Sequence, residues 1–402
     1  MSLVREVRKA ATLHQAWFSI RDNARASKSS TTKKEVRDFE QRLPLRIRSL
    51  QDKLREGYRF EPPVGVLIPK KSGAGKRGLV VSPLPDRVVQ RAILDVLQRY
   101  DSAALQSVME CATSFGGIPG RGVQDTIIEI ERARLTGGAA WIAGSDISGF
   151  FTKIDVAAVV DFVRGAVQDD AFTTLFHNAL TVELDNAAQM SPKDLELFPS
   201  EGIGVAQGCP LSAFAGNIFL REFDKAMNEG PVRCLRYIDD FILLCPSEAV
   251  ARSALEKAKE LLSGLGLEIY DPDKNPRKAF IGRFAGSIEF LGHRMVPGKY
   301  PPTEGNLDSL LRGIDLDIDG FHTHICKLRE GRATSRRQSF VATVSSIDQR
   351  ILSWCGAFCA SSCEDTARRI DSEIDKRIAK LIDMYGKAVK RPQVSRRKLF
   401  GV

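Results

Sequence analysis

Two adjacent carboxylates, Asp239 and Asp240, interrupt the apolar stretch LRYIDDFILL at residues 235–244. The apolar runs on either side predict two short buried strands, with the aspartates in the turn between them. Aspartate is a common turn residue, so the pair alone favours a solvated hairpin tip. Whether these two aspartates take part in catalysis therefore depends on the other carboxylates of the chain.

A third carboxylate, Asp146, ends the apolar strand predicted within WIAGSDISGFFTKID. If that strand lies beside the 235–244 hairpin, Asp146 and Asp239 meet at adjacent strand ends, with Asp240 close behind. Clustered carboxylates raise one another's pKa unless divalent cations neutralise them. Mg²⁺ suits such a site because it binds one or two carboxylates together with water and substrate phosphates. Two such ions about 3.5 to 4 Å apart bind the attacking and the leaving oxygen of an in-line displacement at phosphorus. The aspartates therefore indicate polymerase or nuclease chemistry.

The elements that must position these aspartates begin with helices, which the apolar pattern predicts across residues 1–60. A Ser/Thr cluster at 29–32 is expected to cap one of them, and Pro44 is expected to break or kink the run that follows. Residues 64–100 predict a strand, a glycine-rich turn, a second strand and a helix. The turn satisfies G-x-G-x-x-G, but a strand follows it where a dinucleotide fingerprint requires a helix, so we exclude a Rossmann domain.

Between residues 140 and 295, short apolar strands alternate with helical patterns. This order predicts an α+β layer with helices on one face of a sheet. The strands are expected in AAWIAGSDI, LRYIDDFILL and SIEFLGHRM. The last hundred residues predict helices that end in a basic segment, with a loop at 327–345.

The composition fits a globular protein of two or three domains, with 402 residues, 43% hydrophobic and 27% charged. Lys and Arg total 59 against 50 for Asp and Glu, and the formal charge of +9 would attract a polyanion such as nucleic acid if the cations cluster. The N-terminus lacks a signal-peptide core, and no apolar run reaches the ~18 residues of a membrane span. We therefore expect a cytoplasmic protein without membrane contact.

Eight cysteines without a secretory signal are expected to be reduced thiols. Cys355, Cys359 and Cys363 recur every fourth residue, and the HTHIC segment at 322–326 adds two histidines and another cysteine. This spacing differs from a tight CxxC chelate and favours small apolar side chains on a buried helix face. Metal binding by the three cysteines stays open.

Six segments, in order across residues 60–295, resemble the motifs of reverse transcriptases. YIDD at 237–240 resembles the Y-x-D-D motif, and DISGFFTKID resembles the first palm motif. The other four are LIPKKSGAGKRGLVVSPLPDRVVQRAI for the fingers, FGGIPGRGVQDTI for the R-P-G-R-S-x-H-D-A block, GIGVAQGCPLSAFAGNIFL for the Q-G-x-P-L-S-P block, and EFLGHRM for the F-L-G primer-contact motif. A looser match, beginning SWCGAF, resembles the thumb of group II intron enzymes.

The resemblance implies an α+β right-hand polymerase. Its expected parts are a helical N-terminal extension at 1–60, fingers at 61–140, a palm with an RRM-like antiparallel sheet at 141–298, and a helical thumb with a basic C-terminal region at 299–402. The implied activity is RNA-directed DNA polymerisation, which adds dNTPs to a primer 3′ end with two Mg²⁺ ions. Mn²⁺ is expected to substitute for Mg²⁺.

The clustered carboxylates and the resemblance jointly indicate Asp146, Asp239 and Asp240 as catalytic residues, with Ile147 beside them in the metal site. Phe290, Leu291 and Gly292 of the F-L-G motif are expected, by resemblance, to contact the primer.

The residues expected by resemblance to bind the nucleotide are Lys70, Arg77, Phe151, Gln207, Gly208, Tyr237 and Lys274. Phe151 would be the bulky gate that rejects a 2′-hydroxyl, with a core aromatic as the alternative. Lys70 and Arg77 would clamp the triphosphate, with a solvated hairpin charge as the alternative for Lys70. Lys274 would lie near the leaving pyrophosphate, where a lysine can act as a general acid.

Two further cations of the glycine-rich turn, Lys71 and Lys76, are expected to be solvated charges instead.

Gly78, Ala213 and Gln124 replace residues that are usually Pro, Pro and His in the family motifs, which distances the chain from typical intron maturases. No segment with CxxC pairs follows the thumb, and the N-A-x-x-H and V-T-G segments of retron enzymes are not found. The expected class is a freestanding bacterial reverse transcriptase, either group II intron-like or of the abortive-infection and phage-defence kind, with retrons as a more distant match. The expected partners are a structured noncoding RNA as template, the DNA product and dNTPs, and the oligomeric state stays open.

Two other functions stay open at this point. One is an RNA-binding maturase or scaffold that keeps the polymerase fold for its basic groove. The other is untemplated or protein-templated nucleotide addition by the same metal site.

Overall fold

The computed structural model describes residues 2–27, 29–70, 75–285 and 288–402. The chain forms two compact units. The first comprises Met1–Arg121, Ala143–Cys245 and Ala249–Ile281, and the second comprises Gly122–Ile142, Pro246–Glu248 and Gly282–Val402.

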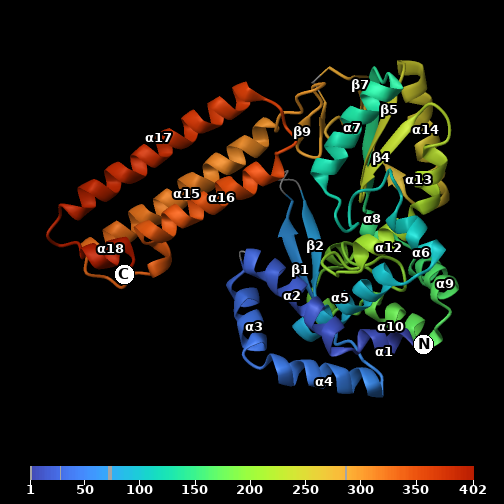
Figure 1. Ribbon diagram of the computed structural model, residues 1–402, viewed down its shortest axis with the longest axis horizontal. Coiled ribbons are helices and arrows are strands. Elements are labelled where there is room, and N and C mark those ends of the chain that lie inside the picture. The colour runs from blue at the N-terminus through green and yellow to red at the C-terminus, as the bar shows by residue number, and fades with distance from the viewer. Residues whose placement is uncertain (1, 28, 71–74, 286–287) are drawn as a thin grey trace. The chain divides into compact units, whose positions relative to one another are not determined.

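The first unit begins with four helices, α1 (Leu3–Val7), α2 (Ala10–Ala26), α3 (Ser30–Glu40) and α4 (Leu43–Glu56), as the sequence predicted (Figure 1). The hydroxyl of Ser29 caps α3 by accepting a hydrogen bond from the Thr32 amide. Pro44 lies in the first turn of α4, where its missing N–H has no helical partner to lose. Trp17 of α2 stacks on Phe39 of α3 with ring centroids 4.6 Å apart, which closes the core of this helical layer.

A β-hairpin follows, formed by β1 (Val64–Pro69) and β2 (Lys76–Val81), which pair antiparallel from Val64 with Val81 to Pro69 with Lys76. The helix α5 (Leu84–Arg99) comes next and packs against α2 (Figure 1). The predicted order of two strands followed by a helix is confirmed. Lys71 and the next three residues of the turn lie outside the described residues.

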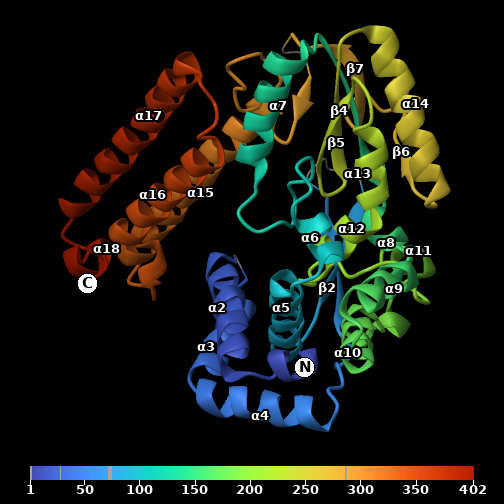
Figure 2. The ribbon, with the colours of Figure 1, turned by 45° about the vertical axis from the view of Figure 1, so that its right-hand side comes forward.

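A five-stranded sheet carries the carboxylates. Its strands run in the order β4-β5-β3-β6, with β7 paired to β3, and are β3 (Trp141–Ser148), β4 (Arg233–Tyr237), β5 (Asp240–Cys245), β6 (Glu268–Ile269) and β7 (Ala279–Arg283). The pairs β4–β5 and β3–β6 are antiparallel. The helices α13 (Arg221–Met227) and α14 (Glu248–Gly264) run alongside β4 and β5 in both views (Figures 1 and 2). The mixture of helices and antiparallel sheet confirms the predicted α+β class.

The remaining helices of this part of the chain lie between α5 and β4 in the sequence. They are α6 (Ala103–Met109), α7 (Val123–Gly137), α8 (Phe150–Lys153), α9 (Val156–Val167), α10 (Asp170–Leu180), the 3-10 turn Ala187–Gln189, α11 (Pro192–Leu195) and α12 (Ser212–Phe219).

The second unit contains a short hairpin and a helical bundle. The segment SIEFLGHRM, predicted as one strand, forms two strands, β8 (Glu289–Phe290) and β9 (His293–Arg294), that pair with each other. The bundle consists of α15 (Glu304–Arg329), α16 (Phe340–Ala357), α17 (Glu364–Val389) and α18 (Arg396–Phe400), and Figures 1 and 2 show the three long helices side by side. Buried side chains such as Leu310, Ile314 and Phe321 of α15 form its core. The loop expected at 327–345 is shorter, because α15 continues to Arg329 and α16 starts at Phe340.

The expectation of a buried helix face for the three spaced cysteines is wrong. Cys355 and Cys359 are exposed and Cys363 is half-buried. The helix α16 ends at Ala357, so Cys359 lies beyond it and Cys363 is the N-cap residue of α17. Gln124 of α7 fastens this helix end, because its Nε2 donates to the Gly356 carbonyl and its Oε1 accepts from the Ala360 amide.

None of the helices in the described part of the chain has both the length and the apolar character needed to span a membrane.

Candidate active site

The turn of the β4–β5 hairpin holds the two adjacent aspartates. Tyr237 and Asp240 pair across the hairpin, so Ile238 and Asp239 form its tip. The Asp239 carbonyl accepts a hydrogen bond of 2.9 Å from the amide of Ile147 in β3. Because Asp146 directly precedes Ile147, the structure brings Asp146 and Asp239 to adjacent strand ends.

Burial makes ionisation of the two hairpin carboxylates unfavourable. It raises the pKa of Asp239 above its usual value, against the lowering influence of the Arg77 and Arg236 guanidinium groups. Burial, together with the negative charge of Asp239, raises the pKa of Asp240 to about 7. A cation placed between such carboxylates favours their charged forms.

A cavity of about 450 Å³ opens beside these carboxylates within the first unit. Of the residues singled out from the sequence, those that line it are Lys70, Arg77, Asp146, Ile147, Phe151, Gln207 and Asp239. Asp240, Tyr237, Gly208 and Lys274 are outside this lining. The cavity therefore places carboxylates, cations and an aromatic ring around one space, as a site for a magnesium-bound phosphate ester requires.

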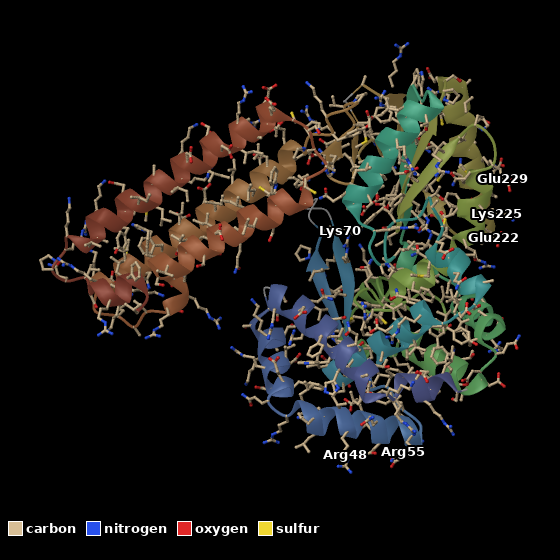
Figure 3. The ribbon with its side chains drawn as sticks, in the orientation of Figure 1. Arg48, Arg55, Lys70, Glu222, Lys225 and Glu229 are labelled. Carbon is tan, nitrogen blue, oxygen red and sulfur yellow. The ribbon has the colours of Figure 1, made fainter. Side chains whose placement is uncertain are left out.

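The cations of the β1–β2 hairpin form one wall of the cavity. Lys70 and Arg77 are exposed, and Figure 3 shows Lys70 at the end of the hairpin. Lys76 also lines the cavity, but its ammonium lies 3.1 Å from an Asp194 carboxylate oxygen. Its charge is thus already paired, which leaves Lys70 and Arg77 better placed to bind phosphate.

The segment Gln207-Gly208 is attached to the second strand of that hairpin. The carbonyl of Gln207 accepts a hydrogen bond of 2.9 Å from the Val80 amide. Gly208 has a φ of +115°, and a Cβ at this position would lie 2.7 Å from the Val80 carbonyl oxygen. Only glycine allows this approach, so the backbone fixes the Gln207 side chain against the cavity.

Phe150 and Phe151 follow β3 and differ in their surroundings. Phe150 is 2% exposed and lies against Gly216 of α12, whereas Phe151 is only partly buried. The carbonyl of Phe151 accepts a hydrogen bond of 2.7 Å from the Val205 amide. This contact anchors the Phe151 backbone and leaves part of its ring open to the cavity.

Lys278 is a cavity residue that the sequence did not single out. Its ammonium contacts the Asp146 carboxylate and lies 5.6 Å from the centre of the Tyr270 ring, and its carbonyl accepts a hydrogen bond of 3.0 Å from the Asp146 amide. Burial and the nearby charges of Lys70 and Arg77 lower the pKa of Lys278. Lys274, which the sequence suggested for this region, is 80% exposed and lies 4.0 Å from Asp271.

The predicted primer-contact residues lie in the second unit, at the turn between β8 and β9. Phe290 is buried, and Leu291 and Gly292 have φ values of +47° and +78°. Asn306 of α15 donates a hydrogen bond of 3.0 Å to the Gly292 carbonyl, which fastens the turn to the helical bundle.

In the described residues, no three His, Cys, Asp or Glu side chains are grouped in a way that could hold a metal ion, and this includes the region of the three spaced cysteines. The donors at the cavity nevertheless fit magnesium, because Mg²⁺ needs only one or two carboxylates and takes its other ligands from water and phosphate. Asp146 and Asp239 both border the cavity.

Comparison with known proteins identifies the class. Residues 68–295, more than half of the chain, match the family described as reverse transcriptase (RNA-dependent DNA polymerase). The chain belongs to this family and carries the domain of an RNA-directed DNA polymerase. Proteins of this kind bind RNA templates and make DNA.

Two curated relatives are similar in sequence. Protein YkfC of Escherichia coli (strain K12) is 26% identical over 294 residues, which cover 63% of this chain and 72% of YkfC. The group II intron-encoded protein LtrA of Lactococcus lactis subsp. cremoris is 25% identical over 181 residues, which cover 45% of this chain but only 28% of LtrA. Among solved structures, a chain of a partial Cas6-RT-Cas1–Cas2 complex is similar, with a TM-score of 0.37, 20% identity, and coverage of 65% of this chain and 43% of that chain.

Proposed function

We propose that this protein extends a primer 3′ end with dNTPs on an RNA template by two-metal-ion nucleotidyl transfer. The observation that carries the proposal is the meeting of Asp146 and Asp239 at one cavity that Lys70 and Arg77 also line. The carboxylates provide ligands for Mg²⁺, or for Mn²⁺ in its place, and the two cations of the hairpin bind phosphate. Asp240 and the Ile147 backbone complete the acidic end of the site.

The side chains of the cavity have separate roles in the reaction. Arg77 presents a planar guanidinium that can bind a triphosphate through two hydrogen bonds, and Lys70 adds a second positive charge. Gln207 and Gly208 hold the nucleotide from the side of β2, and Tyr237 at the end of β4 contacts it beside the hairpin tip. Lys278, rather than Lys274, supplies a proton to the leaving pyrophosphate, because its ammonium lies against Asp146.

Bound magnesium would activate the attacking primer hydroxyl and offset the charge that develops on the leaving phosphate. The raised pKa values of Asp239 and Asp240 support this requirement, since the two carboxylates gain more from a nearby cation than exposed aspartates would.

The chain has the parts of a right-hand polymerase at the positions that the sequence suggested. Residues 1–60 form an N-terminal extension, 61–140 the fingers, 141–298 the palm and 299–402 the thumb with its basic C-terminal region. Phe290, Leu291 and Gly292 contact the primer. The template is a dedicated structured noncoding RNA, and the biological role is in phage defence. The relationship to LtrA supports the group II intron-like character of the enzyme.

The experiment that tests this function measures DNA synthesis from labelled dNTPs by the full chain, with and without a defined RNA template and primer. Incorporation that requires both Mg²⁺ and the RNA supports the proposal, and sequencing the product made from co-purified nucleic acid identifies the natural template. Incorporation without RNA would favour untemplated or protein-templated addition. Tight RNA binding without incorporation would favour a maturase or scaffold.

Replacing Phe151 by valine should relax the choice between deoxyribonucleotides and ribonucleotides. We expect the preference for dNTPs over rNTPs to fall by roughly 100-fold, because the space for a 2′-hydroxyl opens while the other nucleotide contacts stay. Ratios of kcat/KM for dNTP and rNTP measure this change. Phe172→Leu is the control, since Phe172 is buried in α10 outside the cavity lining and its truncation should lower stability without changing the ratio. An unchanged ratio in Phe151→Val would make Phe151 a core aromatic only.

A further inference from the structure

A fully buried arginine lies two residues before the tip of the β4–β5 hairpin. Arg236 occupies β4, is 0% exposed, and forms an ion pair with Asp224 of α13, which is 3% exposed. Arginine is almost never buried to this extent unless it is paired. Removing this guanidinium from water costs free energy, which its hydrogen bonds have to offset.

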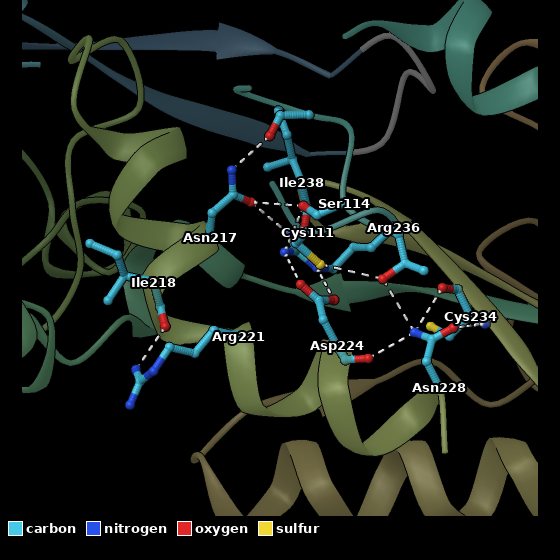
Figure 4. A network of polar contacts seen from close by, with 12 residues as sticks. Cys111, Ser114, Asn217, Ile218, Arg221, Asp224, Asn228, Cys234, Arg236 and Ile238 are labelled. Atoms are coloured by element: carbon cyan, nitrogen blue, oxygen red, sulfur yellow. Dashed lines mark hydrogen bonds and ion pairs between the residues drawn. The ribbon is translucent and has the colours of Figure 1, made fainter. Parts of the chain in front are cut away.

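Every N–H of the Arg236 guanidinium has an acceptor (Figure 4). Nε and Nη2 donate to the two carboxylate oxygens of Asp224 at 2.7 and 2.5 Å. Nη2 also donates to the Ser114 hydroxyl at 3.0 Å, and Nη1 donates to the Asn217 side-chain oxygen at 3.1 Å. The fifth hydrogen bond, of 2.8 Å, runs from Nη1 to the carbonyl of Ile238. Lysine, with three N–H donors, cannot make all five.

The Ile238 carbonyl belongs to a strained position. Ile238 has a φ of +62°, which is rare for a β-branched residue and is held only where the surroundings impose it. Gly116 packs so closely on the turn that a Cβ there would lie 2.3 Å from the Ile238 side chain. The loop around Gly116 is itself tied to β4, because the Phe115 amide donates to the Arg236 carbonyl and the Arg236 amide donates to the Thr113 carbonyl.

The two peptide groups on either side of the Asp239 Cα are therefore both fixed. Arg236 holds the carbonyl of Ile238, and the Ile147 amide holds the carbonyl of Asp239. The first contact comes from the core behind the hairpin, and the second comes from the strand that carries Asp146. Together they set the direction in which the Asp239 carboxylate leaves the backbone.

We propose that Arg236 is a positioning residue for the reaction: through its hydrogen bond to the Ile238 carbonyl it holds the hairpin tip in the left-handed conformation that aims Asp239 at Asp146. This inference rests on the proposed function, because it assumes that both carboxylates take part in catalysis. Asp224 holds the guanidinium in place through two hydrogen bonds. Arg236 itself touches no substrate.

Arg236→Lys tests the inference, because it keeps the positive charge beside Asp224 and removes the fork that reaches Ile238. We expect kcat for dNTP incorporation to fall by about 100-fold, the effect of misplacing a reacting group by about 1 Å, with KM for dNTP little changed. Amide hydrogen exchange in the 233–245 segment should become faster by about the same factor, which reports the loosened turn independently of activity. Ser114→Ala is the matched control, since it removes one buried hydrogen bond of the same guanidinium and leaves the bond to Ile238.

A second substitution separates positioning from a general loss of folding. Ile238→Gly allows a positive φ without strain, so in the Arg236→Lys background it should recover roughly a tenth or more of the lost kcat. Ile238→Gly alone serves as the reference. If Arg236→Lys does not fold, Asp224→Asn, which keeps the size and one acceptor oxygen, replaces it with an expected loss of about 10-fold in kcat.

Wild-type kcat and exchange in the folded Arg236→Lys or Asp224→Asn variant would overturn the inference. So would an equal loss in Ser114→Ala, or a loss that Ile238→Gly does not reduce. Failure of the proposed function looks different: the Asp146→Asn variant would then retain synthesis, or the wild-type protein would show none, whereas the exchange experiment would still report whether Arg236 holds the turn.

Discussion

Asparagine in place of Asp239 is expected to reduce RNA-templated DNA synthesis by a factor on the order of 10³, because a ligand charge worth several kcal/mol of transition-state stabilisation is lost. The substitution keeps the shape of the side chain, so the hairpin tip and the hydrogen bond from Ile147 should stay. The measurement is single-turnover incorporation of a dNTP on a defined RNA template and primer, compared with the wild-type protein at the same Mg²⁺ concentration.

Stability should move in the opposite direction to activity in this variant. Burial raises the pKa of Asp239, which means that its charged form is unfavourable in the folded protein without a bound cation. At neutral pH the neutral asparagine removes this penalty, so the midpoint of thermal unfolding should be unchanged or higher. Loss of synthesis together with a retained midpoint would separate a chemical role from a folding defect.

Asp161→Asn is a suitable control, because Asp161 is exposed on α9 and pairs with Arg164, and a surface ion pair of this kind contributes little. We expect wild-type synthesis from it. RNA-templated synthesis that survives Asp239→Asn would contradict the assignment of this carboxylate to the catalytic site, even though the chain belongs to the reverse transcriptase family.

The elements around the β4–β5 hairpin could be predicted because their signals are local. The apolar runs on either side of Asp239 and Asp240 specify two strands, and the short polar interval between them specifies the turn. The strand before Asp146 has the same kind of pattern. Only their adjacency needed an assumption, and the hydrogen bond between Ile147 and Asp239 shows that the two strand ends do meet.

The features that were missed depend on contacts between distant parts of the chain. The spacing of Cys355, Cys359 and Cys363 fits a helix, but the helix stops at Ala357, where Gln124, more than two hundred residues earlier, bonds to its end. Nothing near the cysteines carries that information. For Arg236 a signal was present, since a charged residue within an apolar strand is unusual, but the sequence alone does not reveal that Asp224 is its partner.

A backbone contact between distant segments also determines which of two lysines reaches the cavity. Lys274 and Lys278 lie four residues apart, and both could have been placed near a leaving pyrophosphate from sequence position. The carbonyl of Lys278 bonds to the Asp146 amide, which brings Lys278 to the cavity and leaves Lys274 in solvent beside Asp271. Sequence similarity cannot resolve a shift of one turn in a loop that has weak motif character.

Lys278→Ala is therefore expected to lower kcat by about 100-fold, the lower end of the contribution of a general acid, whereas Lys274→Ala should leave kcat unchanged. The ammonium of Lys278 contacts Asp146, so it is within reach of a phosphate that binds beside this carboxylate. Steady-state kinetics with saturating template, primer and dNTP compare the two variants. Both lysines are more than half exposed, so neither substitution should impair folding.

The pH dependence distinguishes a proton donor from a simple positive charge. A general acid works only while protonated, so activity should fall as pH rises through its pKa. Burial and the charges of Lys70 and Arg77 lower the pKa of Lys278, so this decline should begin at a lower pH than for an ordinary lysine. The side chain of the Lys278→Arg variant stays charged across this pH range, so the alkaline decline in activity should disappear while part of kcat remains. If Lys278→Arg instead keeps full kcat and the same alkaline decline, Lys278 contributes charge alone and the proton for pyrophosphate comes from elsewhere.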